Sequence, residues 1–469
     1  MTASHIRQAL WSSVVDELTA DLENQDKLFL DFAPIITPMK SDCHLQRPQT
    51  PTIADVVWKI AVLASLVQIV SATFLLKDFS TPNASVSIAH NVVSTGEFWG
   101  GNPERLWGRY ARGKRLRMFN LPGEPLLLAA AFRVLPASAL RYLHIPFTTL
   151  LIACATWMAG RVGGRSLAWV TGLVAMLNPF TVLHGPIWDD IFAASALTWA
   201  AITLVWLHVK RSRPERNWAT VALLAGLGAA AALLRAEAQA VLGVLGLAAL
   251  ALPKLRSARV QGLALIVGIA VALGGWGLRN KVVSGRFFTG STHDGITLWE
   301  SVYPSARESI LRRGGAEWLD LERMSSDYDK TRGMSELEAN RYFTHRAVAY
   351  ISSHPHALAR LAGVKLVVDS FGVDFTRPLQ STRNLVGIGC NGALIALALF
   401  SLARHWTMAL SEEERFFIRT VAIITLSIDF GLFVVGPVGL RYGMTMYPLL
   451  WTAAAMTLLQ KIRGHDGPA

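Results

Sequence analysis

Carboxylates and arginines that interrupt long apolar runs are the residues of this chain whose types and spacing could do chemistry. Asp189 and Asp190 stand side by side before one apolar run, and Arg235 and Glu237 lie two residues apart between two others. Adjacent carboxylates repel each other, so one can hold a proton near neutral pH or bind a cation. The alternatives are helix capping for the two aspartates and a local ion pair for Arg235 and Glu237.

Another set of side chains is suited to an anion. Arg279 and Arg441 each stand at one end of an apolar run, and six cations crowd into a short hydrophilic stretch: Arg105, Arg109, Arg112, Lys114, Arg115 and Arg117. The arginine fork matches phosphate oxygens in bidentate fashion. The alternative is anchoring at lipid headgroups, where long basic side chains also collect. We predict phosphate or substrate contacts for Arg109, Arg112, Arg117, Arg235, Glu237, Arg279 and Arg441.

The elements that must position these residues are apolar helices. Apolar residues make up 52% of the chain and charged residues 17%, and the apolar residues come in blocks of about 20, the length that crosses a bilayer as a helix. A soluble helix of that length would show a polar face. The sequence therefore predicts an all-α polytopic membrane protein with about 10–11 spans, at 54–77, 141–160, 166–183, 191–209, 217–234, 238–252, 259–278, 384–404, 416–436 and 442–460.

Charge in the short connections predicts the orientation. Lys and Arg gather in 161–165, 210–216, 254–259 and 461–463, and the positive-inside rule puts such connections in the cytoplasm. The two long hydrophilic loops, 78–140 and 279–383, then both face outward. The net charge of +12 is thereby explained by membrane lipids rather than nucleic acid. The three scattered cysteines form neither a disulfide framework nor a metal spacing.

The predicted organisation has four parts. Residues 1–53 are a cytosolic tail, and 54–278 a transmembrane module that contains the first periplasmic loop, 78–140. Residues 279–383 are the second periplasmic loop with juxtamembrane helices, and 384–469 the last transmembrane helices. The apolar run 122–135 is too short to span the membrane comfortably and is predicted to lie at the interface.

Several motifs together resemble a known family. The chain is similar to the bacterial polyprenyl-phosphate-dependent glycosyltransferases of the GT-C class, the glycosyltransferase family 39-like group that includes protein O-mannosyltransferases and the lipid A aminoarabinose transferase. The resemblance rests on ordered segments: Ile88–Phe98, Asn120–Pro125, Leu234–Glu237, Trp276–Asn280 followed by Gly285 to Gly295, Glu338–Pro355 with Lys365, and Leu440–Tyr442 with Pro448.

The resemblance implies sugar transfer from a polyprenyl-phosphate donor to a lipid, glycan or protein acceptor at the periplasmic face of the bacterial inner membrane. A carboxylate would act as general base, and cations, or a divalent metal ion, would stabilise the leaving phosphate. The family's first-loop acid is missing, because Thr81–Asn83 stand where it is expected, and the nearest acid is Asp78. We therefore predict Asp78, Asp189 and Asp190 as the catalytic set, and leave metal ligands unassigned.

Other classes stay open. A transporter of lipid-linked sugars would need charges along a path through the membrane, often with repeated halves. A polymerase or ligase acting on undecaprenyl-diphosphate glycans would also use basic loops. The missing first-loop acid leaves room for a relative of the family without catalytic activity.

Overall fold

The structure of the protein, a computed structural model, describes residues 52–75, 84–100, 116–184, 190–209, 217–313, 325–371, 380–404, 410–436 and 445–465. All of these belong to the unit Pro51–Ala469. Almost all of the predicted cytosolic tail lies outside them. So do five predicted site residues: Asp78, Arg109, Arg112, Asp189 and Arg441.

Each of the predicted apolar runs overlaps one or two helices in its described residues. The structure confirms an all-α fold, and the described residues contain no strand, only a single bridge between Gly100 and Leu116. By length and composition, four helical stretches of the described part could cross a membrane: Ile53–Phe74, Ser138–Leu177, Asp190–Val209 and Pro253–Ser284. The bundle helices are α2 (Ile53–Leu75), α6 (Ile145–Leu177), α8 (Asp190–Val209), α9 (Trp218–Leu234), α10 (Ala236–Ala251), α11 (Arg259–Ser284), α17 (Thr382–Arg404), α18 (Glu412–Val435) and α19 (Tyr447–His465).

Two predicted spans are continuous in α6 and separated only by a kink. Gly163 and Gly164 have non-helical backbone, and Gly164 has φ +79° and ψ −169°, a conformation that is essentially restricted to glycine. The first half of α6 packs against α2, where Gly160 meets Ile53. The glycine pair therefore supplies the turn that the two separate spans require.

Two basic connections reach the same end of the bundle. Arg161 donates to Glu414 at 2.7 Å, and Lys254 donates to Glu412 at 2.6 Å. Both acids belong to the first turn of α18, whose start Ser411 caps. The clustering of cations at one end agrees with the charge pattern that set the predicted orientation.

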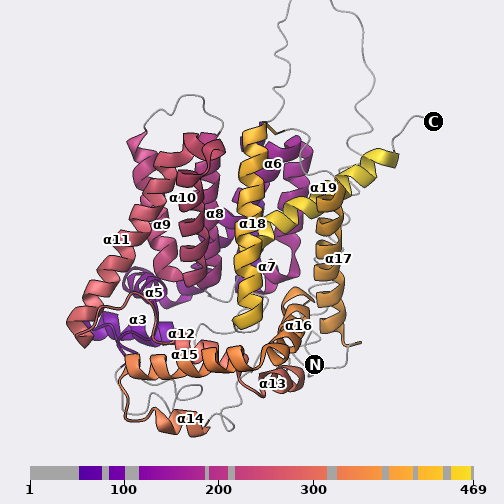
Figure 1. Cartoon of the computed structure of the whole chain (residues 1–469). Coiled ribbons are helices and arrows are strands. Elements are labelled where there is room, and N and C mark those ends of the chain that lie inside the picture. The colour runs from indigo at the N-terminus through magenta and orange to yellow at the C-terminus, as the bar shows by residue number, and fades with distance from the viewer. Residues whose placement is uncertain are drawn as a thin grey trace, which may run out of the picture. The chain divides into compact units, whose positions relative to one another are not determined.

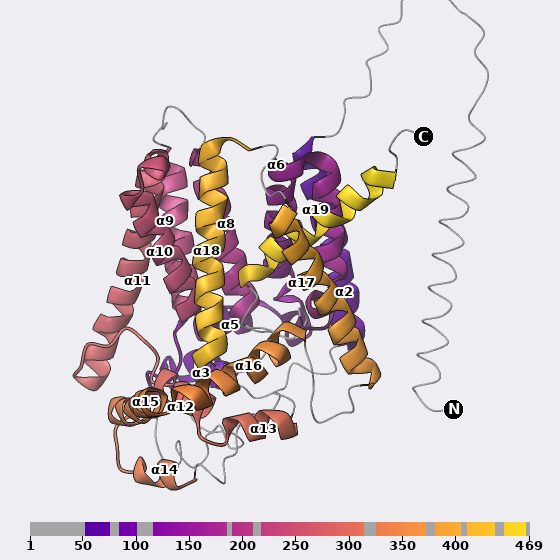
Figure 2. The ribbon, with the colours of Figure 1, turned by 45° about the vertical axis from the view of Figure 1, so that its right-hand side comes forward.

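Further helices cover the opposite end of the bundle, which we call the loop face (Figures 1 and 2). They are α3 (Ala84–Thr95), α5 (Gly123–Val134), α12 (Asp294–Val302), α13 (Ala306–Arg313), α14 (Ser325–Lys330), α15 (Glu336–Ser353) and α16 (Pro355–Phe371). At 12 residues, α5 is too short to span, as predicted. A second apolar core, containing Leu116, Phe119, Trp299 and Phe343, holds the two long loops together.

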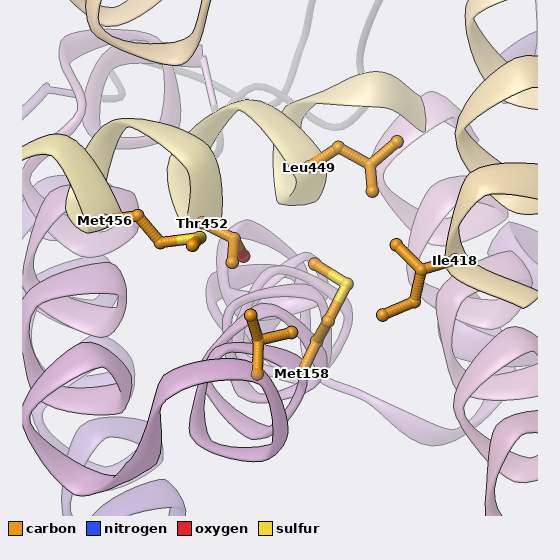
Figure 3. A pocket seen from close by; sticks show the side chains of 6 residues that line it. Met158, Ile418, Leu449, Thr452 and Met456 are labelled. Atoms are coloured by element: carbon orange, nitrogen blue, oxygen red, sulfur yellow. The ribbon is translucent and has the colours of Figure 1, made fainter. Parts of the chain in front are cut away.

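A small cavity lies between α6, α18 and α19 (Figure 3). Met158, Val162, Ile418, Leu449, Thr452 and Met456 line it. Its volume of about 10 Å³ corresponds to room for a single water molecule. A sugar does not fit there, and the lining carries no charge.

Candidate functional site

Asp190, Arg235 and Glu237 form one ion-pair cluster at the loop face, which we call the acidic triad. Arg235 Nη1 donates to Asp190 Oδ1 at 2.8 Å, while Nη2 and Nε donate to the two oxygens of Glu237 at 2.7 and 3.1 Å. The three side chains are 13–19% exposed. Three of the predicted site residues are thereby brought together by the fold.

Helix ends position all three members of the acidic triad. Asp190 opens α8, and Glu237 lies in the first turn of α10. Arg235 is the single extended residue between α9 and α10, with φ −150° and ψ 145°. Its amide donates to Ala231 and its carbonyl accepts from Gln239, so the break between the helices satisfies its own backbone groups. The fixed backbone of Arg235 places its guanidinium beside Asp190, the first residue of α8.

The two long loops are paired next to the acidic triad. The amides of Thr292 and His293 donate to the carbonyls of Met118 and Phe119 at 2.8 and 3.2 Å. The Ser291 hydroxyl also donates to the carbonyl of Phe119, and the Phe119 and His293 rings stack with centroids 4.5 Å apart. We call this pairing of 118–119 with 291–293 the loop joint. It shows that the first and second loops contact each other directly.

Glu336 strengthens the loop joint from α15. Its carboxylate accepts from the amides of Arg117 and Met118 at 2.6 and 3.1 Å and from the Thr292 hydroxyl at 2.9 Å. Burial raises the pKa of Glu336, against the lowering effect of these hydrogen bonds. One side chain of the second loop therefore holds main-chain groups of the first.

Arg279 performs the same task from the end of α11. Its guanidinium donates to the carbonyls of Arg117 and Phe98 at 2.6 and 2.9 Å. It also lies over the rings of Trp276 and Phe98, 4.8 and 5.1 Å from their centroids. The predicted phosphate contacts of Arg117 and Arg279 stay predictions. What the structure shows for Arg279 is a clamp on the first loop.

Close packing connects the loop joint to the acidic triad. A Cβ atom added to Gly123, at the start of α5, would lie 2.6 Å from the backbone carbon and oxygen of Leu233. Leu233 is two residues before Arg235, so the first loop touches the α9–α10 break through a position that requires glycine. Nearby, Ser85 donates to Glu124 at 2.5 Å and accepts from Asn120 at 2.9 Å.

Asp294 is a candidate that the sequence interpretation missed. It opens α12 directly after the loop joint, and its Oδ2 accepts from the Ser291 amide at 3.2 Å. Part of the side chain is exposed to solvent, while the surrounding protein removes water from the rest of the carboxylate. This partial desolvation raises its pKa to about 6, with Glu237 adding to the rise and Ser291 and Arg235 opposing it. In the sequence, Asp294 is visible as the acid that follows Ser291, Thr292 and His293. An acid at the start of a helix is also an ordinary cap, so its position alone does not indicate catalysis.

Metal binding has no site among the described side chains. Their His, Cys, Asp and Glu residues form no group of three or more arranged to hold an ion, and the guanidinium of Arg235 already occupies the space between Asp190 and Glu237. The predicted acids Asp78 and Asp189 lie outside the described residues, as do Arg109, Arg112 and Arg441.

Comparisons with known proteins return membrane glycosyltransferases. No family model and no curated protein sequence matches the chain. A crystal structure of the Archaeoglobus fulgidus oligosaccharyltransferase, tethered with an acceptor peptide containing the NVT sequon, is similar with a TM-score of 0.48 and 15% identity, over 87% of this chain and 50% of that one. The chain thus spans about half the length of that enzyme.

A second similar structure is ArnT from Cupriavidus metallidurans bound to undecaprenyl phosphate, with a TM-score of 0.37 and 13% identity, over 87% of this chain and 79% of that one. Both neighbours are glycosyltransferases of the GT-C class, the class that the sequence motifs resemble.

Proposed function

We propose that the protein is a glycosyltransferase that spans the bacterial inner membrane several times, with the loop face in the periplasm. It would move a sugar from a polyprenyl-phosphate donor to a hydroxyl of a lipid, glycan or protein acceptor. The observation that carries the proposal is the meeting of the two long loops at the loop joint, beside the acidic triad at one end of the apolar bundle.

The proposed reaction replaces one bond to the sugar by another. The acceptor oxygen attacks the anomeric carbon, the bond from that carbon to the phosphate oxygen breaks, and polyprenyl phosphate leaves with the electron pair. A carboxylate must take the hydroxyl proton. Asp190 is suited to orient the acceptor, because Arg235 holds its carboxylate in one position. Asp78 and Asp189 stay proposed members of the catalytic set.

Positive charge is needed where the phosphate leaves. We assign this role to arginines of the first loop and of two helix ends, Arg109, Arg112, Arg117, Arg279 and Arg441. The isoprenoid tail would lie in the bilayer. Near Arg279, Leu278 and Val282 are 60% and 87% exposed, so apolar surface and cation occur together at the end of α11.

A divalent metal ion is the other source of positive charge that the resemblance implies. The described His, Cys, Asp and Glu side chains form no group of three or more that could hold one. Transfer measured with and without EDTA tests this expectation directly, and an activity that EDTA abolishes and Mg²⁺ or Mn²⁺ restores would assign a metal to residues outside the described set.

The test is sugar transfer by the purified protein in detergent or liposomes. Synthetic polyprenyl-phosphate sugars serve as donors, and mass spectrometry follows the release of polyprenyl phosphate. Lipid that co-purifies with the protein identifies the natural carrier. Asp190→Asn should lower the rate at least tenfold, whereas Asp329→Asn, an exposed acid on α14, should not change it.

Different results would favour the other classes. Movement of a lipid-linked sugar across liposomes without bond cleavage would indicate a transporter. Release of a diphosphate carrier from undecaprenyl-diphosphate glycans would indicate a polymerase or ligase. Donor binding without turnover for every sugar and acceptor offered would indicate a relative that lacks catalytic activity.

A further inference from the structure

We propose that Asp294 is the general base of the reaction, in place of the carboxylates that are missing from the first loop. This inference rests on the proposed function and adds a catalytic residue from the second loop. Asp294 opens α12 directly after the loop joint, and its carboxylate interacts electrostatically with Glu237 and Arg235 of the acidic triad.

The backbone around Asp294 fixes its carboxylate. The Ser291 amide donates to Oδ2 at 3.2 Å, and the next residue, Gly295, is held to α15 by a 2.7 Å hydrogen bond from its amide to Asn340 Oδ1. A Cβ atom at Gly295 would lie 2.3 Å from the Asn340 carbonyl oxygen, so α12 starts in close contact with α15. A base must be held in this way to meet a hydroxyl at the correct distance.

One oxygen of Asp294 is available for a proton. In the part of the chain that the structure describes, one hydrogen bond, from the Ser291 amide, reaches Oδ2 and none reaches Oδ1. The side chain is exposed to solvent, so an acceptor can approach it. Glu336, by contrast, accepts three hydrogen bonds inside the loop joint, and both oxygens of Glu237 bind Arg235.

The charged groups near Asp294 set its affinity for a proton. Glu237 of α10 and Arg235 before it act on Asp294 in opposite directions. Glu336 of α15 binds the adjacent Thr292, and α18, which also packs against α12, carries the buried acid Asp429. With a pKa of about 6, Asp294 is ionised at neutral pH and is a stronger base than an ordinary aspartate, as a general base should be.

The acceptor hydroxyl gives its proton to Asp294 Oδ1 while its oxygen forms the bond to the anomeric carbon. The bond between that carbon and the phosphate oxygen breaks, and the electron pair leaves with polyprenyl phosphate. Asp294 then returns the proton to water.

The experiment compares Asp294→Asn, Asp294→Glu and the control Asp329→Asn in the transfer assay from pH 5 to pH 8. Asp294→Asn should lose a hundredfold or more in kcat, within the range of roughly 10²–10⁴ for a general base. Its Kd for undecaprenyl phosphate, the probe, should stay within about twofold of the wild-type value, since the residue touches no phosphate in this scheme. Asp294→Glu should recover part of the rate.

In the wild type, kcat/KM should fall as the pH drops below about 6, because a protonated Asp294 cannot accept the hydroxyl proton. Asp294→Asn should lack this acid limb in its residual activity. Thermal unfolding of each variant identifies a folding defect, and the wild-type pH profile and Asp294→Glu test the proposal if Asp294→Asn does not fold.

Two results would overturn the assignment while leaving the proposed function intact. One is an Asp294→Asn variant that keeps more than a tenth of the wild-type kcat. The other is an active wild type whose kcat/KM is flat between pH 5 and pH 8. A wild-type protein that transfers no sugar from any polyprenyl-phosphate donor overturns the proposed function, and the base assignment with it.

Discussion

The guanidinium of Arg279 donates a 2.6 Å hydrogen bond to the backbone carbonyl of Arg117, although 162 residues separate the two in the chain. A second bond from the same guanidinium reaches the carbonyl of Phe98. The end of α11 therefore holds the first loop at two points. Substitution can distinguish the two hydrogen bonds of the guanidinium from its positive charge as the main contribution of Arg279.

Arg279→Lys keeps the charge but loses the fork and the stacking on Trp276 and Phe98. If the clamp dominates, Arg279→Lys and Arg279→Ala should both lower the free energy of unfolding by about 1.5–3 kcal/mol, the range for hydrogen bonds to a charged group. Thermal unfolding in detergent measures this. Lys281→Ala, at an exposed position of the same helix, is the control. A lysine variant as stable and active as the wild type would favour the phosphate role instead.

Arg235 neutralises two carboxylates that are mostly buried. Arg235→Met should destabilise the protein by about 3–5 kcal/mol, because it leaves Asp190 and Glu237 without their common partner. Adding Asp190→Asn and Glu237→Gln to Arg235→Met should recover a large part of that loss. Unfolding of the single, double and triple variants forms a cycle that measures the coupling. Additive effects would show that the cluster contributes nothing as a unit.

Gly123 leaves no room for a side chain. Gly123→Ala would place a Cβ atom 2.6 Å from backbone atoms of Leu233, and backbone cannot move aside as a flexible side chain can. We expect a loss of about 1–3 kcal/mol from overpacking, together with lower transfer activity because the Arg235 segment shifts. Gly226→Ala is the matched control, since no atom lies within 4 Å of its added Cβ. There the helix should gain about 0.5–1 kcal/mol.

Stability should depend on pH through Glu300 of α12. Burial raises the pKa of Glu300 well above its ordinary value of 4.5, and the hydrogen bond from Tyr328 offsets only part of this. The folded state thus binds a proton more tightly than the unfolded state, so stability is complete below about pH 4.5 and falls as the pH rises toward the folded pKa.

Glu300→Gln removes this titration and keeps an oxygen that can accept from Tyr328. The variant should match the wild type at pH 4–5 and unfold at a higher temperature at pH 8, by an amount equivalent to about 1–3 kcal/mol. Glu308→Gln, exposed on α13, should leave the pH dependence as it is. An unchanged pH dependence in Glu300→Gln would show that another group is responsible.

The helices could be predicted from the sequence because their signal is local. An apolar run of membrane length forms a helix whatever its neighbours are, since its backbone groups must be satisfied within the run. The same holds for the break in α6, where adjacent glycines permit the backbone of Gly164. The candidate site was only partly predicted. Asp190, Arg235 and Glu237 do lie together, whereas Asp294 was not identified, because an acid at the start of a helix has the same sequence signature whether it caps or catalyses.

The sequence by itself determined the class of protein, its helices and the end at which cations collect, because hydrophobicity and charge act on each segment separately. Only the tertiary structure decided the partners. The carbonyls that bind Arg279 carry no sequence signature, since every residue has one. Asp190 and Arg235 are 45 residues apart, and Asp294 lies further along. Their meeting depends on distances that helix packing sets, and from these distances follow the ion pairs, the pKa of Asp294 and the chemistry proposed for it.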